Sequence, residues 1–137
     1  MDVVLAPDIY VNASVALGSP PERVVQRAFR GAGKPKTSAW VMERVQSMLH
    51  ALPEFKDDAV EQQMKTIRGL VEIVENGDHF IEDWREALVA LAKSAGVGRV
   101  LTDHPDLLGS TRADGIEFVS SEHWLAEQAT PPPPPVV

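Results

Sequence analysis

The sequence predicts a single α/β domain in which helices flank a central, mainly parallel β-sheet. Short runs of β-branched and aliphatic residues alternate along the chain with longer segments whose apolar residues recur every three or four positions. The length of 137 residues suits one domain rather than two, and 44% hydrophobic with 24% charged residues is typical of a globular chain. We therefore expect a three-layer sandwich whose ligands bind at the carboxyl ends of the strands.

The order of the predicted elements supports this fold class. Strands are expected at residues 3–5, 99–102 and 116–119, helices at 20–30, 39–52, 56–75, 81–95 and from 121 onward, and a helical turn at 104–108. Ser19 and either Thr37 or Ser38 are candidate helix N-caps, and Gly96 is a candidate C-cap. Residues 71–74 are alternatively a short strand, and Asp8 is expected near the carboxyl end of the first strand.

The chain is expected to divide into a domain at residues 1–129 and a tail at 130–137. The tail contains five consecutive prolines, which lack backbone donors and favour extended polyproline II. We expect this tail to be flexible.

Composition excludes several classes of protein. The absence of cysteine excludes disulfides and thiolate metal sites, and the four histidines show no paired zinc spacing. The sequence contains neither a nucleophile motif nor a glycine-rich phosphate loop. No apolar run could cross a bilayer and no signal peptide is evident, so we expect a cytoplasmic protein without a membrane partner.

Charge is distributed unevenly along the chain. The net charge of −7 is unfavourable for binding nucleic acid through a broad surface, so any contact with RNA must be confined to a small part of the surface. Residues 22–36 are basic, and Arg23, Arg27 and Arg30 fall on one face of the predicted helix. This row is either a solvated helix face or a patch that binds phosphate or an acidic partner.

Four carboxylates are placed by the predicted fold near one edge of the sheet. Asp8 and Asp103 follow strands, Asp83 lies in the first turn of a helix, and Glu43 lies within another helix. Carboxylates that meet at such an edge require a metal ion between them or raised pKa values. Taken alone, Glu43 could be a surface residue, Asp83 a charge favoured by the helix dipole, and Asp103 a turn residue.

The spacing of these acids is similar to that of a known family. The segment from Asp83 to Leu108 has an acid-led helix, a strand, a threonine and an aspartate-leucine pair. The family's first strand, the helix that bears its second acid, and its last strand and helix have similar counterparts in the same order, at residues 3–13, 37–43, 115–119 and 124–125. From residue 2 to about residue 128 the chain resembles the PIN-domain family, which includes the ribonuclease toxins of bacterial toxin-antitoxin pairs.

The resemblance implies a metal-dependent ribonuclease. Carried across by position, Glu43, Asp83 and Asp103 would be catalytic, and together with Asp8 they would hold one or two Mg²⁺ or Mn²⁺ ions that activate water. The implied partners are an RNA substrate, a protein antitoxin and a second copy of the chain.

The match departs from the family pattern at two positions. Ala6 occupies the place of the usual first acid, so either Asp8 replaces it, or the natural protein is inactive, or Ala6 is an engineered substitution. His104 occupies the place where relatives often carry the first aspartate after the threonine. We take Asp103 as the better metal candidate because it directly follows the strand, and we expect Asp106 to cap the turn at residues 104–108. For the third acid we prefer Asp83 to Glu86, which lies one helical turn away.

Two other functions remain open. A non-catalytic module of the same fold could bind RNA or a protein through the face of Arg23, Arg27 and Arg30. A receiver-like signalling domain also binds Mg²⁺ at strand ends, but no lysine after a late strand supports it.

Overall fold

The computed structural model of the chain describes residues 3–30, 35–74, 83–108, 112–113 and 115–129. Its elements in chain order are β1 (Val3–Leu5), α1 (Pro7–Val15), α2 (Pro20–Arg30), β2 (Lys36–Thr37), α3 (Ala39–His50), α4 (Asp57–Leu70), β3 (Glu72–Ile73), α5 (Trp84–Ala95), β4 (Arg99–Leu101), α6 (Pro105–Leu108), β5 (Arg112–Ala113), β6 (Ile116–Val119) and α7 (Ser121–Ala129). The predicted proline-rich tail lies outside the described residues.

The main sheet has the strand order β1-β4-β6-β5. β4 pairs in parallel with β1 on one side and with β6 on the other, and β5 is an antiparallel edge strand. A separate parallel pair, β2 and β3, packs beside β1. The predicted, mainly parallel α/β fold is therefore confirmed.

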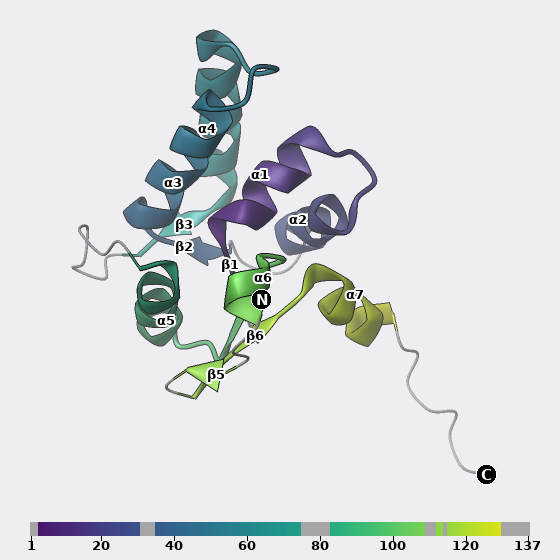
Figure 1. Cartoon of the computed structure of the whole chain (residues 1–137), viewed down its shortest axis with the longest axis vertical. Helices are drawn as coiled ribbons and strands as arrows, with labels where there is room; N and C mark the ends of the chain where they lie inside the picture. The colour runs from purple at the N-terminus through teal and green to yellow at the C-terminus, as the bar shows by residue number, and fades with distance from the viewer. Residues whose placement is uncertain (1–2, 31–34, 75–82, 109–111, 114, 130–137) are drawn as a thin grey trace.

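Helices cover this sheet and enclose one core (Figure 1). α5 packs against β1, β2 and β4, α1 packs against α2 and α3, and α7 packs against α2. Figure 1 shows α5 on one side of the strands and α7 on the other. The strands of the main sheet bury their apolar side chains almost completely, among them Val4, Leu5, Val100, Leu101 and Phe118. No helix in the described ranges combines the length and apolar character of a membrane span.

Local capping explains several helix ends. The Ser38 hydroxyl accepts a hydrogen bond from the Val41 backbone N–H, which confirms Ser38 as the N-cap of α3. Gly96 ends α5 in the left-handed region at φ 72°, as the sequence predicts. α5 begins at Trp84 with Asp83 as its N-cap, so Asp83 precedes the first turn rather than lying inside it.

The first helix was not predicted, and the placement of Asp8 at a strand end was wrong. β1 is only three residues long, and the chain enters α1 at Pro7, which puts Asp8 in the first turn of that helix. Proline suits the first helical position because its missing N–H would have no helical partner there. Ile9 and Val11 favour a strand by local preference, but burial in the core stabilises them in the helix.

The short strands were also difficult to predict. β2 and β5 have two residues each, which is too few to show the alternation of apolar and polar residues by which a strand is recognised in a sequence. β3 matches the alternative of a short strand at residues 71–74.

Candidate functional site

The carboxyl ends of three parallel strands converge at one edge of the sheet. Leu101 is in register with Leu5 on one side and with Val119 on the other. Two backbone bonds continue the pairing past the strand ends: Ala6 N donates to Leu101 O at 2.9 Å, and Thr102 N donates to Val119 O at 3.0 Å. The residues that follow each strand are therefore close neighbours, as the fold class predicts.

Asp8 lies at this edge with both carboxylate oxygens engaged by its own chain. Its Oδ1 accepts a hydrogen bond from the Thr102 hydroxyl at 2.8 Å, and its Oδ2 accepts one from the Asp103 backbone N–H at 2.8 Å. The Thr102 Oγ1 in turn accepts from the His104 backbone N–H at 3.1 Å. Asp8 is only 7% exposed, so its carboxylate ties α1 to the loop after β4.

Asp103 is engaged in the same way on the other side of that loop. Its Oδ1 accepts from the Ser121 backbone N–H at 2.9 Å, and its Oδ2 accepts from the Ser121 hydroxyl at 2.5 Å. Ser121 begins α7, whose first N–H groups have no helical partner, so Asp103 supplies an acceptor to the start of that helix. We refer to Asp8, Thr102, Asp103 and Ser121 as the carboxylate cluster.

Burial raises the pKa of Asp8 above its ordinary value of 3.8. The negative charge of Asp103 raises the pKa further, while the hydrogen bonds from the Asp103 N–H and the Thr102 hydroxyl lower it without cancelling the effect of burial. No described cation lies within salt-bridge distance of this carboxylate. The cluster is thus an internal hydrogen-bonded network rather than an ion-paired one.

The other two predicted acids do not join the cluster. Glu43 is exposed on α3. Asp83 is exposed at the start of α5, where its Oδ1 accepts from the Glu86 backbone N–H at 3.0 Å. The structure therefore brings Asp8 and Asp103 together, whereas Asp83 lines a pocket with His104 and Asp106. Within the described ranges, no three His, Asp or Glu side chains form a group that could hold a metal ion.

The described residues do not assemble the Mg²⁺ or Mn²⁺ site of several acids that the resemblance implies. Mg²⁺ demands near-octahedral oxygen ligands, usually one or two carboxylates completed by waters. Each carboxylate oxygen of Asp8 and Asp103 accepts a hydrogen bond from a donor of the same chain. Ala6 is fully buried at the N-cap of α1, and its side chain offers no oxygen. Metal ligation by Asp8, Glu43, Asp83 and Asp103 stays a prediction.

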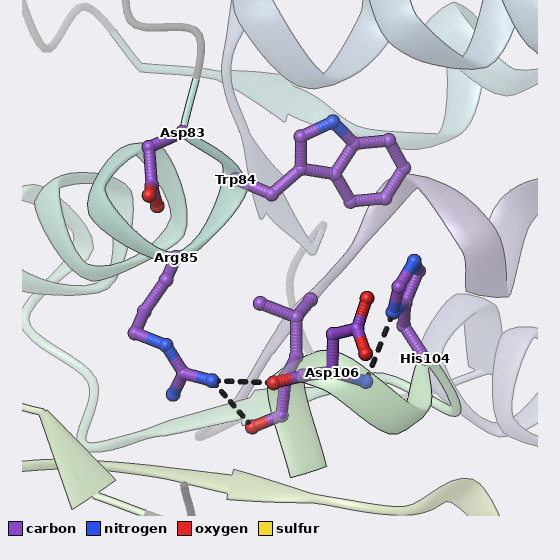
Figure 2. Close-up of a pocket in the computed structure, with 6 residues that line it drawn as sticks. Asp83, Trp84, Arg85, His104 and Asp106 are labelled. Carbon is purple, nitrogen blue, oxygen red and sulfur yellow. Dashed lines mark hydrogen bonds between the residues drawn. The ribbon is translucent and has the colours of Figure 1, made fainter. Parts of the chain in front are cut away.

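A second polar site lies nearby, in a pocket of about 320 Å³ between the start of α5 and α6 (Figure 2). Its lining residues are Asp83, Trp84, Arg85, His104, Asp106 and Leu107. The ring centroids of Trp84 and His104 are 5.8 Å apart with an interplanar angle of 52°. Trp84 also meets Trp40 edge-to-face at 5.8 Å, which anchors the indole to the core.

The polar groups of this pocket divide into fixed and free ones. The Arg85 Nη2 donates to the backbone oxygens of Asp106 and Leu107 at 2.7 and 3.0 Å, and its guanidinium lies over the Phe118 ring. The Asp106 backbone N–H donates to His104 Nδ1 at 3.2 Å. His104, not Asp106, therefore caps the turn that begins α6, which corrects the expected role of Asp106. The exposed Asp106 carboxylate rises towards the side on which Trp84 lies (Figure 2).

The three arginines of α2 form the exposed side of that helix. Arg23, Arg27 and Arg30 are exposed, while Val24 and Ala28 are buried on the opposite side. Within the described part of the chain, no carboxylate pairs with these guanidinium groups. We refer to this row as the arginine face.

Comparison with known proteins supports the fold. No family model and no curated protein matches the sequence. Among solved structures, the chain is similar to one chain in the crystal structure of VapBC2 from Rickettsia felis bound to a DNA fragment from their promoter. The TM-score is 0.65, the identity is 11%, and the match covers 88% of this chain and 98% of that one. The expected PIN-like fold is thereby confirmed, and at this identity the likeness establishes the fold alone.

Sequence reasoning missed Ser121 and the pocket. Ser120 and Ser121 stand between a strand and a helix, which is a cap signal, but nothing local shows that the acceptor is Asp103, 18 residues earlier. Trp84 and His104 are 20 positions apart, and they meet where Arg85 at the start of α5 bonds the backbone oxygens of α6 (Figure 2).

Proposed function

We propose that this chain is a non-catalytic PIN-like module that binds RNA through its arginine face. The observation that carries the proposal is that both acids of the carboxylate cluster bind donors of their own chain, while the buried Ala6 offers no oxygen at the position of the family's usual first acid. A nuclease of this family type needs its acids grouped around a metal ion, and among the described residues no three His, Asp or Glu side chains form such a group.

The arginine face supplies the binding surface. Arg23 and Arg30 are seven residues apart on α2, which places them about 10.5 Å apart along the helix axis at about 1.5 Å per residue. Guanidinium groups bind phosphate oxygens in a bidentate fashion, and these three have no carboxylate partner among the described residues. Because the whole chain carries −7, the contact with a polyanion is confined to this row.

The family resemblance implies both RNA and a protein antitoxin, and RNA is preferred because its regularly spaced phosphates match a row of guanidinium groups. An antitoxin-like protein with an acidic surface is the competing occupant of the arginine face. The structural likeness to a chain of VapBC2 supports considering such a partner, and a homodimer stays a prediction of the same kind.

The binding test compares two double variants that remove the same charge. We expect Arg23→Ala with Arg27→Ala to weaken binding of a labelled single-stranded RNA about tenfold, measured by fluorescence anisotropy. Lost phosphate contacts should also reduce the slope of log affinity against log salt by about 1.4, at about 0.7 per contact for single strands. The matched control is Lys65→Ala with Arg68→Ala on the exposed side of α4, which should leave both quantities nearly unchanged. Equal losses in the two double variants would contradict the proposal, and binding of an acidic protein but not RNA would identify the competing occupant.

The catalytic alternative is tested with the same RNA. Wild-type protein and the Ala6→Asp variant are incubated with Mg²⁺ or Mn²⁺, and the RNA is resolved by length. We expect neither protein to cleave, because Asp8 and Asp103 are bound to donors of their own chain and Asp83 caps the start of α5. Metal-dependent cleavage by either protein would overturn the non-catalytic proposal and restore the predicted ribonuclease.

A further inference from the structure

We propose that the pocket between α5 and α6 binds one unpaired nucleobase, of the kind that carries an amino group next to a ring nitrogen acceptor. The feature that carries this inference is the combination of an aromatic pair, a free carboxylate and a free ring N–H in one pocket (Figure 2). The inference rests on the proposed function only in taking RNA as the source of the base.

The size of the pocket restricts its occupant. Ligand pockets for small molecules begin at about 300 Å³, so a pocket of about 320 Å³ suits a single small ring system. Trp84 and His104 are too close, at 5.8 Å, to admit a third ring between them, since that would require two stacking distances of about 3.5 Å each. The base must therefore stack on the open side of the aromatic pair. Aromatic stacking is the usual way in which proteins hold unpaired bases.

The His104 ring presents a hydrogen-bond donor to this ligand. Its Nδ1 accepts from the Asp106 backbone N–H, so in the neutral ring the proton is on Nε2. In Figure 2 this second nitrogen points away from α6, towards the side of Trp84. A ring nitrogen of a base is the matching acceptor.

The Asp106 carboxylate presents the complementary acceptor. It is exposed, no hydrogen bond among the described residues uses its side-chain oxygens, and it lies beside the His104 ring (Figure 2). An exocyclic amino group donates to such an oxygen. Adenine and cytosine offer an amino group next to a ring nitrogen, whereas uracil offers a carbonyl oxygen in place of the amino group.

Charge argues against other occupants. A phosphate would meet the carboxylates of Asp83 and Asp106, both of which line the pocket. A cationic side chain would meet the Arg85 guanidinium and the Nε2–H of His104. A neutral planar ring with one donor and one acceptor finds a partner for each without a repelling charge.

The first test uses the wild-type protein with short single-stranded RNAs of one base each. We expect oligoadenylate to bind about tenfold more tightly than oligouridylate, because stacking is stronger and both polar edges are matched. Asp106→Ala and His104→Asn should each reduce this preference severalfold. The His104→Asn variant serves as the sharper probe, because an asparagine can still accept from the backbone N–H two residues later while it lacks the ring. Equal affinity for the two RNAs in the wild type would overturn the inference.

The second test uses adenosine alone and the intrinsic fluorescence of the protein. Trp40 and Trp124 are buried, at 2% and 7% exposure, so stacking should quench mainly Trp84. Quenching by adenosine should disappear in Trp84→Phe, while that variant, which keeps an aromatic ring, should retain the preference for oligoadenylate. Trp84→Ala is less informative because Trp84 packs on the core.

The two tests separate failure of the pocket from failure of the proposed function. Arginine-dependent RNA binding without a base preference would reject the pocket and leave the proposed function standing. Quenching by adenosine without any binding of RNA would support the pocket and reject RNA as the source of the base. Quenching by an acetylated arginine amide but not by adenosine would overturn the inference in favour of a cationic ligand.

Discussion

The carboxylate cluster and the pocket occupy adjoining parts of the same sheet edge, yet they differ in where their polar atoms point. In the carboxylate cluster every oxygen of Asp8 and Asp103 accepts a hydrogen bond from the chain itself. In the pocket the Asp106 carboxylate faces outward and the His104 ring has one nitrogen still to be matched. The first region therefore contributes to folding, and the second presents polar groups that have no partner among the described residues.

This difference teaches that an acidic residue at the functional edge of a fold is not by itself a catalytic residue. Asp103 directly follows β4, where the family pattern places an acid, yet its carboxylate begins α7 instead of facing a cleft. Hydrogen bonds inside the chain give such a carboxylate a structural role that its place in a sequence pattern does not reveal.

The largest expected effect comes from removing the buried carboxylate of the carboxylate cluster. Asp8→Ala should lower the free energy of unfolding by about 3 kcal/mol, because it leaves the buried Thr102 hydroxyl and the Asp103 N–H without an acceptor. Urea denaturation measures the loss. The matched variant in the pocket is Asp106→Ala, which removes an exposed carboxylate and should change the free energy by about 0.5 kcal/mol or less. Similar losses in the two variants would mean that the two regions do not differ as described.

A smaller effect is expected at the other end of the cluster. Ser121→Ala removes the hydroxyl that donates to Asp103 but keeps the backbone N–H bond, so it should cost about 1.5 kcal/mol. Ser47→Ala is the control, because Ser47 is exposed within α3 and alanine favours a helix. A loss no greater than in this control would show that the Asp103–Ser121 bond does not stabilise the start of α7.

These two regions also mark the limit of what the sequence could predict. The periodicity of α5, the Ser38 cap and the Gly96 cap are local signals, and all three were confirmed. The convergence of Asp8 and Asp103 was likewise predictable, because parallel strands end at one edge. The partners of those acids were not, since Thr102 lies 94 residues from Asp8 and only the packed fold brings them together. The exposure of Glu43 and Asp83 depends on helix rotation and on the exact helix start, which a spacing pattern does not fix.

The smallest expected effect is a pH dependence of the free energy of unfolding, which we expect from Asp8 in the carboxylate cluster and not from Asp106 in the pocket. Because burial raises the pKa of Asp8 above 3.8, the folded chain binds this proton more tightly than the unfolded chain does. The stability contributed by protonated Asp8 is fully present below the ordinary pKa and is lost as the pH rises through the folded-state pKa. Asp8→Asn cannot ionise, so the wild-type free energy of unfolding minus that of Asp8→Asn should fall as the pH is raised from about 4 towards neutrality.

The comparison is made by urea denaturation of both proteins at matched ionic strength across this range. The same pair of measurements is repeated with Asp103→Asn in both proteins, where removing the neighbouring charge should make the free-energy difference decrease less with pH. Asp106→Asn in the pocket should leave the pH dependence of that difference unchanged. A difference that rises with pH would mean that the folded chain favours the charged form of Asp8. That outcome would make the carboxylate cluster the kind of anionic centre that a divalent cation needs, and would weaken the case for a purely structural role.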